Sequence, residues 1–414
     1  MENSKLKRAV ALVLSVMMVF CLFVTASPAL YATNAVAEED NSTTDEALEI
    51  LDDTKWAKYK EKYASSPKHN DVEITVGSDA ADLSKGGEIT SYLGKDNVVF
   101  LTDTGSVSWT INIPEGKAGL YAIDILYSYL GSDDKRAKAA DIERTLRIDN
   151  AVLKNEVPFT EVRNLTFTKK WVDVLDNVTV EKDAYGNISD IKYDTDSSDN
   201  ERRPVKEIKP EWTNYTVCDP TGNYNGEFYF YLTEGENVIT LQSQKEFMYV
   251  DTITVRAPKT LKTYQEYLAE QTAKGIGAAS ASSIVKLEAE FYSATSSSTI
   301  YGQNDRSSAI TSPQHPSYTW INDVGGRNGS YNWASVGQWI EWEISVPETG
   351  LYTISTRFLQ DAVEGLFVSR RLYINGEVPF EEANNLQFLF DDGWQGGTLG
   401  DGADDSFRHG RTSP

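Results

Sequence analysis

The chain has 414 residues, of which 62 are acidic and 39 are Lys or Arg, so its formal net charge at pH 7 is −23. This balance argues against nucleic acids and anionic membrane surfaces as partners, and it leaves carboxylates free for calcium. For most of these acids, solubility is a sufficient role. The length allows two or more domains with real cores.

The first residues predict export. Basic residues within 5–8 precede an apolar run at 9–24, and small residues around Ala32 follow. This order is typical of a secretory signal peptide at 1–32, with an uncleaved anchor as the alternative. We therefore expect an extracellular, secreted protein from a Gram-positive bacterium. Association with the cell surface is compatible with this expectation.

Cysteine usage agrees with this compartment. Cys21 lies in the signal segment, which leaves Cys218 as the remaining cysteine of the exported chain. A single thiol forms no internal disulfide, so the domains must be stable through their cores alone.

In chain order, residues 33–70 form an acidic leader with helical apolar spacing, and Pro67 stops that helix. From 71 to 257, short alternating runs and Gly, Asp and Asn turns predict a first β-sandwich. It carries an insertion near 170–209, in which Tyr185 to Asn187 predicts a hairpin turn. Residues 258–283 predict a second short helix and an Ala/Ser linker.

A second β-domain at 284–405 repeats the first. The stretch from Val336 to Phe388 matches Ser108 to Leu130 and Glu143 to Phe167 in order. The matched positions carry identical residues. Trp109 corresponds to Trp342 and Arg144 to Arg370, the Gly-Leu-Tyr triplet at 119–121 corresponds to that at 350–352, and the Val-Pro-Phe triplet at 157–159 corresponds to that at 378–380. A repeat this long indicates a duplicated domain. Both tryptophans alternate with polar residues, which predicts that both are core residues.

Local patterns add further predictions for the repeat. Residues 285–290 and the alternating run 339–346 are predicted to be strands, and Asn375-Gly376 is predicted to be a tight turn. Arg144 and Arg370 occupy matching strand positions, which favours a structural role for them. The repeat unit is predicted to be a short helix followed by a sandwich.

These patterns predict an all-β fold with two jelly-roll-like β-sandwich domains joined by short helical linkers. The first copy continues through three more strands at 227–255, whereas the second stops near Asp405 and ends in an atypical basic tail at 406–414. The second sandwich is therefore expected to be truncated, and the chain to be a fragment of a longer protein.

Three motifs of the second copy carry a family resemblance: Val285 to Glu290, GQWIEWEISVPETGLY at 337–352, and RRLYING at 370–376. Together they resemble carbohydrate-binding modules of families 6 and 35. The resemblance implies a non-catalytic β-sandwich in which Glu288 and Glu290 help to hold a structural Ca2+. More narrowly, the same motifs are similar to modules that precede the solute-binding domain in extracellular sugar-transporter proteins of Gram-positive bacteria.

A sugar site needs loop aromatic rings beside amide or charged groups, because sugars present C–H faces and hydroxyls. The densest such cluster has glycines between its rings and contains Tyr318, Trp320, Asn328, Tyr331, Asn332 and Trp333. The alternative is that Trp320 and Trp333 cap the sandwich core. The matching region of the first copy, 78–104, has only Tyr92 and Phe100 as aromatic residues, so we expect its site to be degenerate.

These observations leave three functions open. The first is a secreted, non-catalytic carbohydrate-binding protein with a polysaccharide or oligosaccharide as partner. The second is an accessory segment of a longer solute-binding protein for a sugar transporter, in contact with transporter components or the cell wall and without its own glycan site. The third is a glycosidase built on a carboxylate pair such as Glu381 and Glu382, which is disfavoured because no nucleophile elbow, phosphate loop or zinc motif accompanies it.

Overall fold

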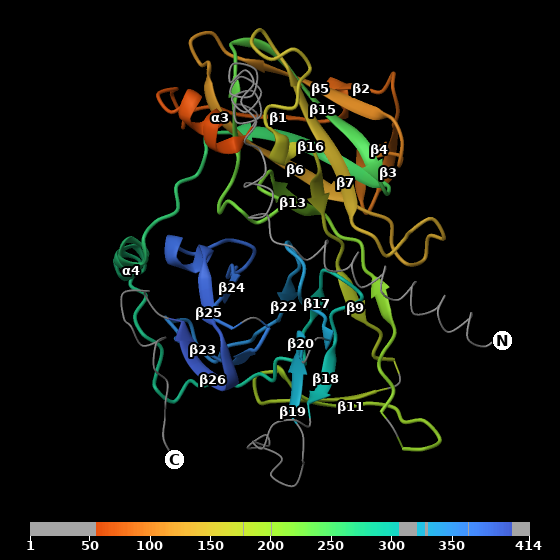
Figure 1. The fold of residues 1–414 in the computed structure, drawn as a ribbon, viewed down its shortest axis with the longest axis vertical. Helices are drawn as coiled ribbons and strands as arrows, with labels where there is room; N and C mark the ends of the chain where they lie inside the picture. Colours follow the sequence, from red (N-terminus) through yellow and green to blue (C-terminus); the bar gives the residue numbers. More distant parts are fainter. Residues whose placement is uncertain are drawn as a thin grey trace, which may run out of the picture. The chain divides into compact units, whose positions relative to one another are not determined.

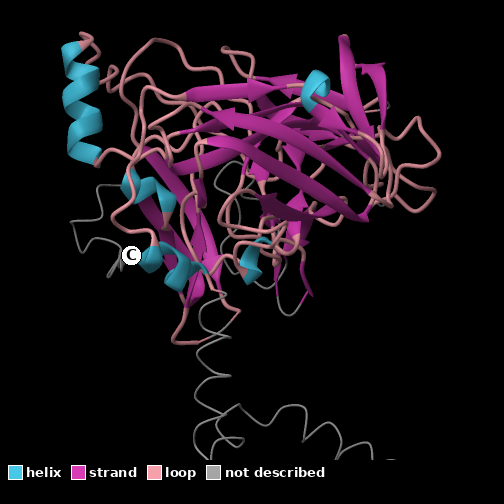
Figure 2. Cartoon of the chain, turned by 90° about the horizontal axis from the view of Figure 1, so that it is seen from above, coloured by secondary structure: helices cyan, strands magenta, loops and turns pink. Residues whose placement is uncertain are grey.

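A computed structural model describes residues 55–399 except 177, 200, 306–320, 328–329 and 363. Strands make up most of the ordered elements in it, and helices are confined to short segments (Figure 2). The predicted all-β class is confirmed. The predicted signal peptide, most of the leader and the basic tail lie outside the described residues.

Residues 73–256 contain two large antiparallel sheets (Figure 1). The seven-stranded sheet has the order β13-β6-β16-β4-β3, with β1 also on β16 and β14 also on β6. Its strands are β1 (Glu73–Val76), β3 (Glu88–Tyr92), β4 (Lys95–Leu101), β6 (Gly119–Ser128), β13 (Thr213–Thr216), β14 (Tyr229–Leu232) and β16 (Met248–Arg256). The five-stranded sheet has the order β2-β5-β15-β7-β8. Its strands are β2 (Ala81–Asp82), β5 (Ser106–Ile113), β7 (Ile142–Asp149), β8 (Leu165–Phe167) and β15 (Gly235–Lys245).

One hydrophobic core joins the two sheets. Alternate residues of β5 are buried, and they share a cluster with alternate residues of β6 and β16, so the sheets pack face to face. Trp109 lies at the centre of this cluster and is fully buried, as predicted. Each apolar side chain buried here contributes about 1.5–3 kcal/mol relative to an exposed one.

A short helix, α3 (Trp56–Lys62), leads into the first sandwich. Its N-terminus is held by the Glu161 carboxylate, which accepts the Trp56 backbone N–H at 3.2 Å. The Trp56 ring packs on Phe159, with the centroids 5.0 Å apart. Glu161 lies in the 3-10 turn Thr160–Val162 between β7 and β8, and Phe159 directly precedes that turn.

The second helix, α4 (Tyr264–Ala273), is anchored in the same way. Its N-terminus carries a capping box formed by Thr263 and Glu266. The Glu382 carboxylate accepts the Tyr264 backbone N–H at 2.9 Å, and the Tyr264 ring lies 5.0 Å from that of Phe380. The predicted repeat unit of a helix plus β-structure is thus present in both copies.

Strand register is also repeated. In the first copy, Arg144 of β7 pairs with Leu165 of β8, and in the second copy Arg370 of β24 (Phe367–Arg370) pairs with Leu386 of β25 (Leu386–Leu389). The pairing of β6 with β13 recurs between β23 (Ile354–Gln360) and β26 (Asp391–Leu399). The sequence repeat is therefore a structural repeat.

The turn that follows β24 also matches its prediction. Asn375 and Gly376 both have positive φ angles, of 52° and 84°, which two-residue hairpin turns require and few other residues tolerate. The turn is closed by the pair Ile374 and Glu377, which corresponds to Ile148 and Glu156 in the first copy.

The insertion adds strands outside the sandwich. The hairpin predicted around Tyr185 is present, with β10 (Thr179–Lys182) antiparallel to β11 (Ile188–Lys192). The rest of the insertion enters a four-stranded sheet of order β12-β9-β17-β22. Its strands are β9 (Trp171–Asp173), β12 (Lys206–Ile208), β17 (Ala294–Thr295) and β22 (Ile340–Glu341). The remaining described strands are β18 (Gly302–Asp305), β19 (Ile321–Val324), β20 (Gly326–Arg327) and β21 (Ser330–Tyr331).

Three predictions for the second copy are wrong. Residues 285–290 form no strand, and the strand predicted over 339–346 is reduced to Ile340–Glu341. Trp342 is half-buried rather than in the core, and its Nε1 donates to the Ala289 carbonyl at 2.9 Å. The physical reason is a shortage of partner strands, because β1 and β5 of the first copy pair with β16 and β15, and no described strand of the second copy takes those places.

Among the described residues, no helix is long and apolar enough to cross a lipid bilayer. Cys218 is a free thiol, and burial raises its pKa.

Candidate functional site

A shallow groove of about 550 Å³ lies in the second copy, beside part of the predicted aromatic cluster. Its lining comes from the loop after β17, from the end of β21 and from the segment that follows β21. It comprises Ser298, Thr299, Tyr301, Tyr331, Asn332, Ala334, Ser335 and Gln338. The groove is thus lined by two tyrosines, two amides and several hydroxyls, which is the mixture that a sugar ring requires.

The hairpin β20–β21 positions Tyr331 and Asn332. Gly326 pairs with Tyr331, and the Gly325 carbonyl accepts the Asn332 backbone N–H at 2.9 Å. Gly325 has a φ angle of 112°, which glycine adopts without the steric cost that other residues meet. The glycines that identified this segment as a loop therefore set the direction of the chain at the groove.

Tyr331 supplies the accessible ring. Its side chain is 36% exposed, and its hydroxyl donates to Asp361 Oδ1 at 3.2 Å. Tyr301 is half-buried, and the Arg203 guanidinium carbon lies 3.2 Å from its ring centroid, so one face of that ring is covered. A ligand can therefore stack on Tyr331 more readily than on Tyr301.

Asn332 supplies a polar group with unused capacity. Its Nδ2 donates to the Tyr301 carbonyl at 3.0 Å. Among the residues that the structure describes, no donor lies within hydrogen-bond distance of its buried Oδ1 atom. A buried acceptor without a partner costs about 1–3 kcal/mol, so a water molecule or a ligand hydroxyl at this position would be stabilised.

Trp333 does not line the groove. Its Nε1 donates to the Gln338 carbonyl at 3.1 Å, and the Arg370 guanidinium covers its ring at 4.2 Å from the centroid. Arg370 also donates to the Trp333 carbonyl at 3.2 Å, and burial lowers the pKa of its guanidinium. Trp333 is therefore a packing residue, in agreement with the alternative that it caps the fold.

Of the six predicted binding residues, the structure brings Tyr331 and Asn332 together in the groove and assigns Trp333 to packing. Tyr318, Trp320 and Asn328 lie outside the described residues.

Sequence reasoning missed Tyr301 and Gln338. Gln338 shapes the loop by accepting the backbone N–H groups of Ala334 and Ser335, each at 2.9 Å. No local signal marked either residue, because Tyr301 stands apart from the aromatic cluster in sequence and Gln338 directly precedes the segment predicted as a strand.

The structure also bears on calcium. Among the described residues, no group of three or more His, Cys, Asp or Glu side chains is arranged to hold a metal ion. Glu288 forms an ion pair with Lys286 at 2.7 Å. In the first copy, Asp251 forms an ion pair with Lys95 at 2.8 Å. The described residues thus do not fit a calcium site, and a calcium role for Glu288 and Glu290 stays an untested prediction.

One carboxylate of the pair considered for glycosidase chemistry has a structural role. Glu382 caps α4 through its hydrogen bond to the Tyr264 backbone, so it is committed to that helix. Arg370, at the end of β24, is engaged with Trp333.

In the first copy, the aromatic residues of the corresponding region pack on aromatic residues at the start of β16. Tyr92 stacks on Tyr249 with the centroids 3.8 Å apart, and Phe100 lies 5.8 Å from Phe247. The Arg136 guanidinium covers the Phe100 ring at 5.5 Å. The expected degeneracy of a first-copy sugar site stays a prediction.

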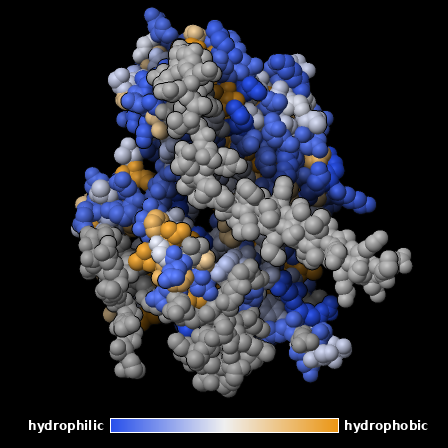
Figure 3. All heavy atoms as spheres, in the orientation of Figure 1, coloured by the Kyte–Doolittle hydropathy of each residue, from blue (hydrophilic) through white to orange (hydrophobic). Residues whose placement is uncertain are grey.

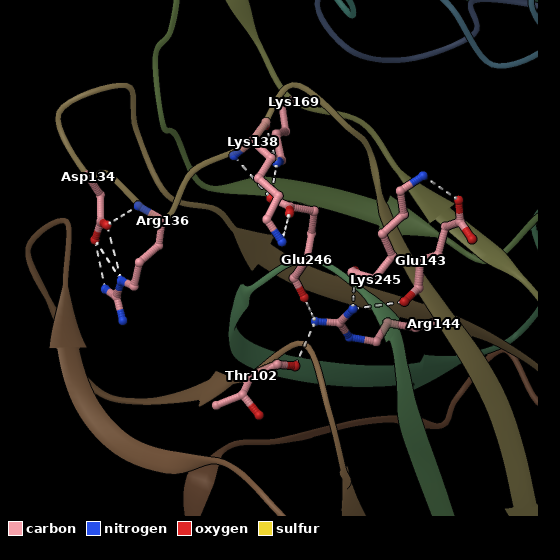
Figure 4. A network of polar contacts seen from close by, with 9 residues as sticks. All are labelled: Thr102, Asp134, Arg136, Lys138, Glu143, Arg144, Lys169, Lys245 and Glu246. Carbon is pink, nitrogen blue, oxygen red and sulfur yellow. Dashed lines mark hydrogen bonds and ion pairs between the residues drawn. The ribbon is translucent and has the colours of Figure 1, made fainter.

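Buried charges secure the loops at this end of the first sandwich (Figure 4). The Arg144 guanidinium is fully buried and donates to the carbonyls of Glu143, Lys245 and Glu246 at 2.7–2.8 Å. Lys169 and Glu246 form a buried ion pair at 2.8 Å. The structural role predicted for Arg144 is confirmed by these contacts.

No protein-family profile matches the chain, and no curated protein matches it either. Among solved structures, the chain is similar to a family 35 carbohydrate-binding module from Clostridium thermocellum, with 13% identity and a TM-score of 0.22 over 45% of this chain and 98% of that one. It is also similar to the CBM35 from Cellvibrio japonicus Abf62, with 12% identity and a TM-score of 0.22 over 45% of this chain and 95% of that one.

A larger enzyme is matched in part. The chain is similar to the Podospora anserina GH26-CBM35 β-(1,4)-mannanase, with 13% identity and a TM-score of 0.25, and it spans 28% of that chain with 46% of its own length. At such identities and TM-scores, none of these similarities assigns a ligand or an activity to this chain.

Proposed function

We propose that the chain is an exported, non-catalytic glycan-binding protein whose binding site is the groove at Tyr331 and Asn332. The observation that carries this proposal is the pairing of an accessible tyrosine ring with an amide oxygen that has no partner among the described residues. An aromatic ring receives the apolar face of a pyranose, and the amide oxygen accepts one of its hydroxyls.

Export is inferred from the basic and apolar order of residues 5–24, and it supports an extracellular glycan as partner. The resemblance of the second-copy motifs to carbohydrate-binding modules points the same way. A groove this shallow suits one or two exposed sugar units of a polymer, whereas catalysis on a glycosidic bond requires a carboxylate pair that flanks the bond.

The full chain is tested on a glycan array, and affinity for any retained glycan is then measured by calorimetry. Tyr331→Ala and Asn332→Ala are each expected to weaken binding about tenfold, since each removes about 1–1.5 kcal/mol of contact energy. Tyr331→Phe keeps the ring and is expected to bind nearly as well as the wild type.

The matched control is Tyr185→Ala, because Tyr185 is a 43% exposed tyrosine on the β10–β11 hairpin, away from the groove lining. It should leave affinity unchanged. Failure of the full chain to bind any glycan, or equal affinity of Tyr331→Ala and the wild type, overturns the proposal.

A further inference from the structure

The insertion of the first copy contacts the loop that forms one side of the groove. We call residues 296–301 the groove loop, because three of its residues line the groove. The groove loop begins directly after β17, and β17 lies between β9 of the insertion and β22 of the second copy (Figure 1). Thr295 of β17 pairs with Trp171 on one side and with Ile340 on the other. Each copy of the repeat thus holds one edge of the strand that carries the groove loop.

A series of hydrogen bonds leads from the insertion into the groove loop. Lys206 Nζ donates to Thr295 Oγ1 at 3.1 Å, and that hydroxyl donates to the Ser297 carbonyl at 2.9 Å. The same carbonyl accepts the Ile300 backbone N–H at 3.2 Å, which closes the turn. Ser297 Oγ accepts the backbone N–H of Thr299 at 3.2 Å, and Thr299 lines the groove. The Lys206 ammonium therefore helps to fix the turn that presents Thr299.

The contact made by Lys206 is buried. Its side chain is 6% exposed and forms an ion pair with Asp173 of β9 at 3.0 Å, and Thr295 is fully buried. Asp173 also accepts a hydrogen bond from the Tyr292 hydroxyl at 2.9 Å, two residues before β17. Hydrogen bonds to charged groups are stronger than neutral ones, and more so away from water. Lys206 and Asp173 therefore constrain the position of β17 more than an exposed pair would.

A second residue of the insertion acts at the other end of the groove loop. The Arg203 guanidinium carbon lies 3.2 Å from the centroid of the Tyr301 ring, so the cation stacks on one face of this groove residue. From the second copy, Asn332 Nδ2 holds the Tyr301 carbonyl at 3.0 Å. Tyr301 is thus oriented by one residue from each copy.

We infer that the insertion of the first copy is a positioning element of the groove in the second copy, with Lys206 and Arg203 as its positioning residues. This inference rests on the proposed glycan binding, and it gives the first copy a part in binding that requires no sugar site of its own. Because coupling between two linked parts is reciprocal, an occupied groove also stabilises the packing of the insertion on β17. The two copies therefore bind a glycan as one unit.

The test uses the full chain and, as the probe, the oligosaccharide that the wild type binds most tightly on the glycan array. Lys206→Met keeps the apolar stem of the side chain and removes its ammonium, and Arg203→Ala removes the cation from the Tyr301 ring. The double variant is expected to bind the oligosaccharide at least about fivefold more weakly in calorimetry. Arg203→Lys retains a cation near the ring and should bind within about twofold of the wild type.

Lys192→Met and Arg202→Ala are the matched controls. Lys192 pairs with Glu181 on the β10–β11 hairpin, where its side chain is 62% exposed and the visible surface near β11 is mostly hydrophilic (Figure 3). Arg202 directly precedes Arg203 and pairs with Asp194 at 3.5 Å. Because both control side chains pair within the insertion, neither substitution should change the affinity.

Hydrogen exchange separates positioning of the groove from a purely structural role. Backbone amides at 206–208 in β12 should exchange about fivefold more slowly when the wild type is saturated with the oligosaccharide, and the double variant should lose this protection. Without glycan, amides of the groove loop should exchange faster in the double variant than in the wild type. Thermal unfolding reports whether each variant folds, and Arg203→Ala alone alters an exposed residue if the double variant does not.

The outcomes distinguish this inference from the proposed function. If the wild type binds a glycan and the folded variants bind it equally well, or if Arg202→Ala weakens binding as much as Arg203→Ala, the inference is overturned and the proposed function stands. Exchange in β12 that does not respond to glycan overturns the inference in the same way. Failure of the wild type to bind any glycan overturns both.

Discussion

Two tryptophans occupy equivalent positions in the repeat, and replacing each by alanine should lower the free energy of unfolding by very different amounts. Trp109 is fully buried between the two sheets of the first sandwich, whereas its counterpart Trp342 is half-buried. Replacement of each by alanine therefore tests whether position in the repeat or burial in the structure decides the contribution to stability.

The size of the effect follows from the contacts. A buried tryptophan removes about 150–250 Å² from water, which at about 25 cal/mol per Å² is worth roughly 4–6 kcal/mol. Trp109 Nε1 has no acceptor among the described residues, and the loss of that unpaired donor recovers about 1–3 kcal/mol. Trp109→Ala should therefore lower the free energy of unfolding by about 3 kcal/mol. Trp342→Ala loses one hydrogen bond and partial burial, so about 1 kcal/mol is expected.

Urea denaturation of the full chain, followed by far-ultraviolet circular dichroism, measures both variants without dependence on tryptophan fluorescence. The midpoint of the first-sandwich transition should move for Trp109→Ala and stay nearly fixed for Trp342→Ala. If the two variants are equally destabilised, or if Trp109→Ala costs less than about 1 kcal/mol, the assignment of the core is wrong.

Three further predictions concern charged groups. Lys169→Met removes the buried ammonium that pairs with the Glu246 carboxylate; among the described residues Lys138 then remains as its partner, with the ammonium at 3.4 Å and the backbone N–H at 3.3 Å. The free energy of unfolding should therefore fall by about 3 kcal/mol in urea denaturation, and a cost below about 1 kcal/mol would contradict this. Burial raises the pKa of Glu246, but the hydrogen bonds of Lys169 and Lys138 and the charge of Lys169 together lower it by more, so the net pKa lies below its usual value. The ionised Glu246 carboxylate therefore stabilises the fold fully above its unfolded-state pKa, and this stabilisation is lost as the pH falls through its folded-state pKa. Glu246→Gln should flatten the decline of melting temperature below about pH 5. An unchanged dependence of melting temperature on pH in this variant would contradict the prediction. If Glu288 and Glu290 help to hold a structural Ca2+, millimolar calcium should raise the melting temperature, EDTA should lower it, and Glu290→Gln should remove that dependence, whereas a melting temperature that calcium and EDTA leave unchanged would contradict the calcium prediction.

The sequence predicted the parts of the fold that depend on local pattern. Alternation placed Trp109 in the core, the Asn375–Gly376 pair marked a tight turn, and the long repeat anticipated register that recurs at Arg144 and Arg370. Each of these depends on residues close in sequence or on a direct comparison of two segments.

Prediction from the sequence failed for strands that require a neighbouring strand to form. Ile344 and Val346 alternate as well as Ile111 and Ile113 do, yet they form no strand, because β-structure requires a neighbour to accept its hydrogen bonds. The same limitation explains the site. Tyr331 and Asn332 were found because they belong to a dense local cluster, whereas Tyr301 reaches the groove only through the fold.

The carboxylates that hold the two helices have a practical consequence for dissecting the chain. Glu161 and Glu382 each accept a backbone N–H from a helix more than a hundred residues earlier in sequence, so each helix is tied to the β-structure that follows it. A recombinant second copy that starts at residue 284 would lack α4, leaving Phe380 uncovered and Glu382 without its helical donor. The segment at 258–283 is therefore an integral part of the second copy, and a recombinant second copy should begin before α4 rather than at residue 284.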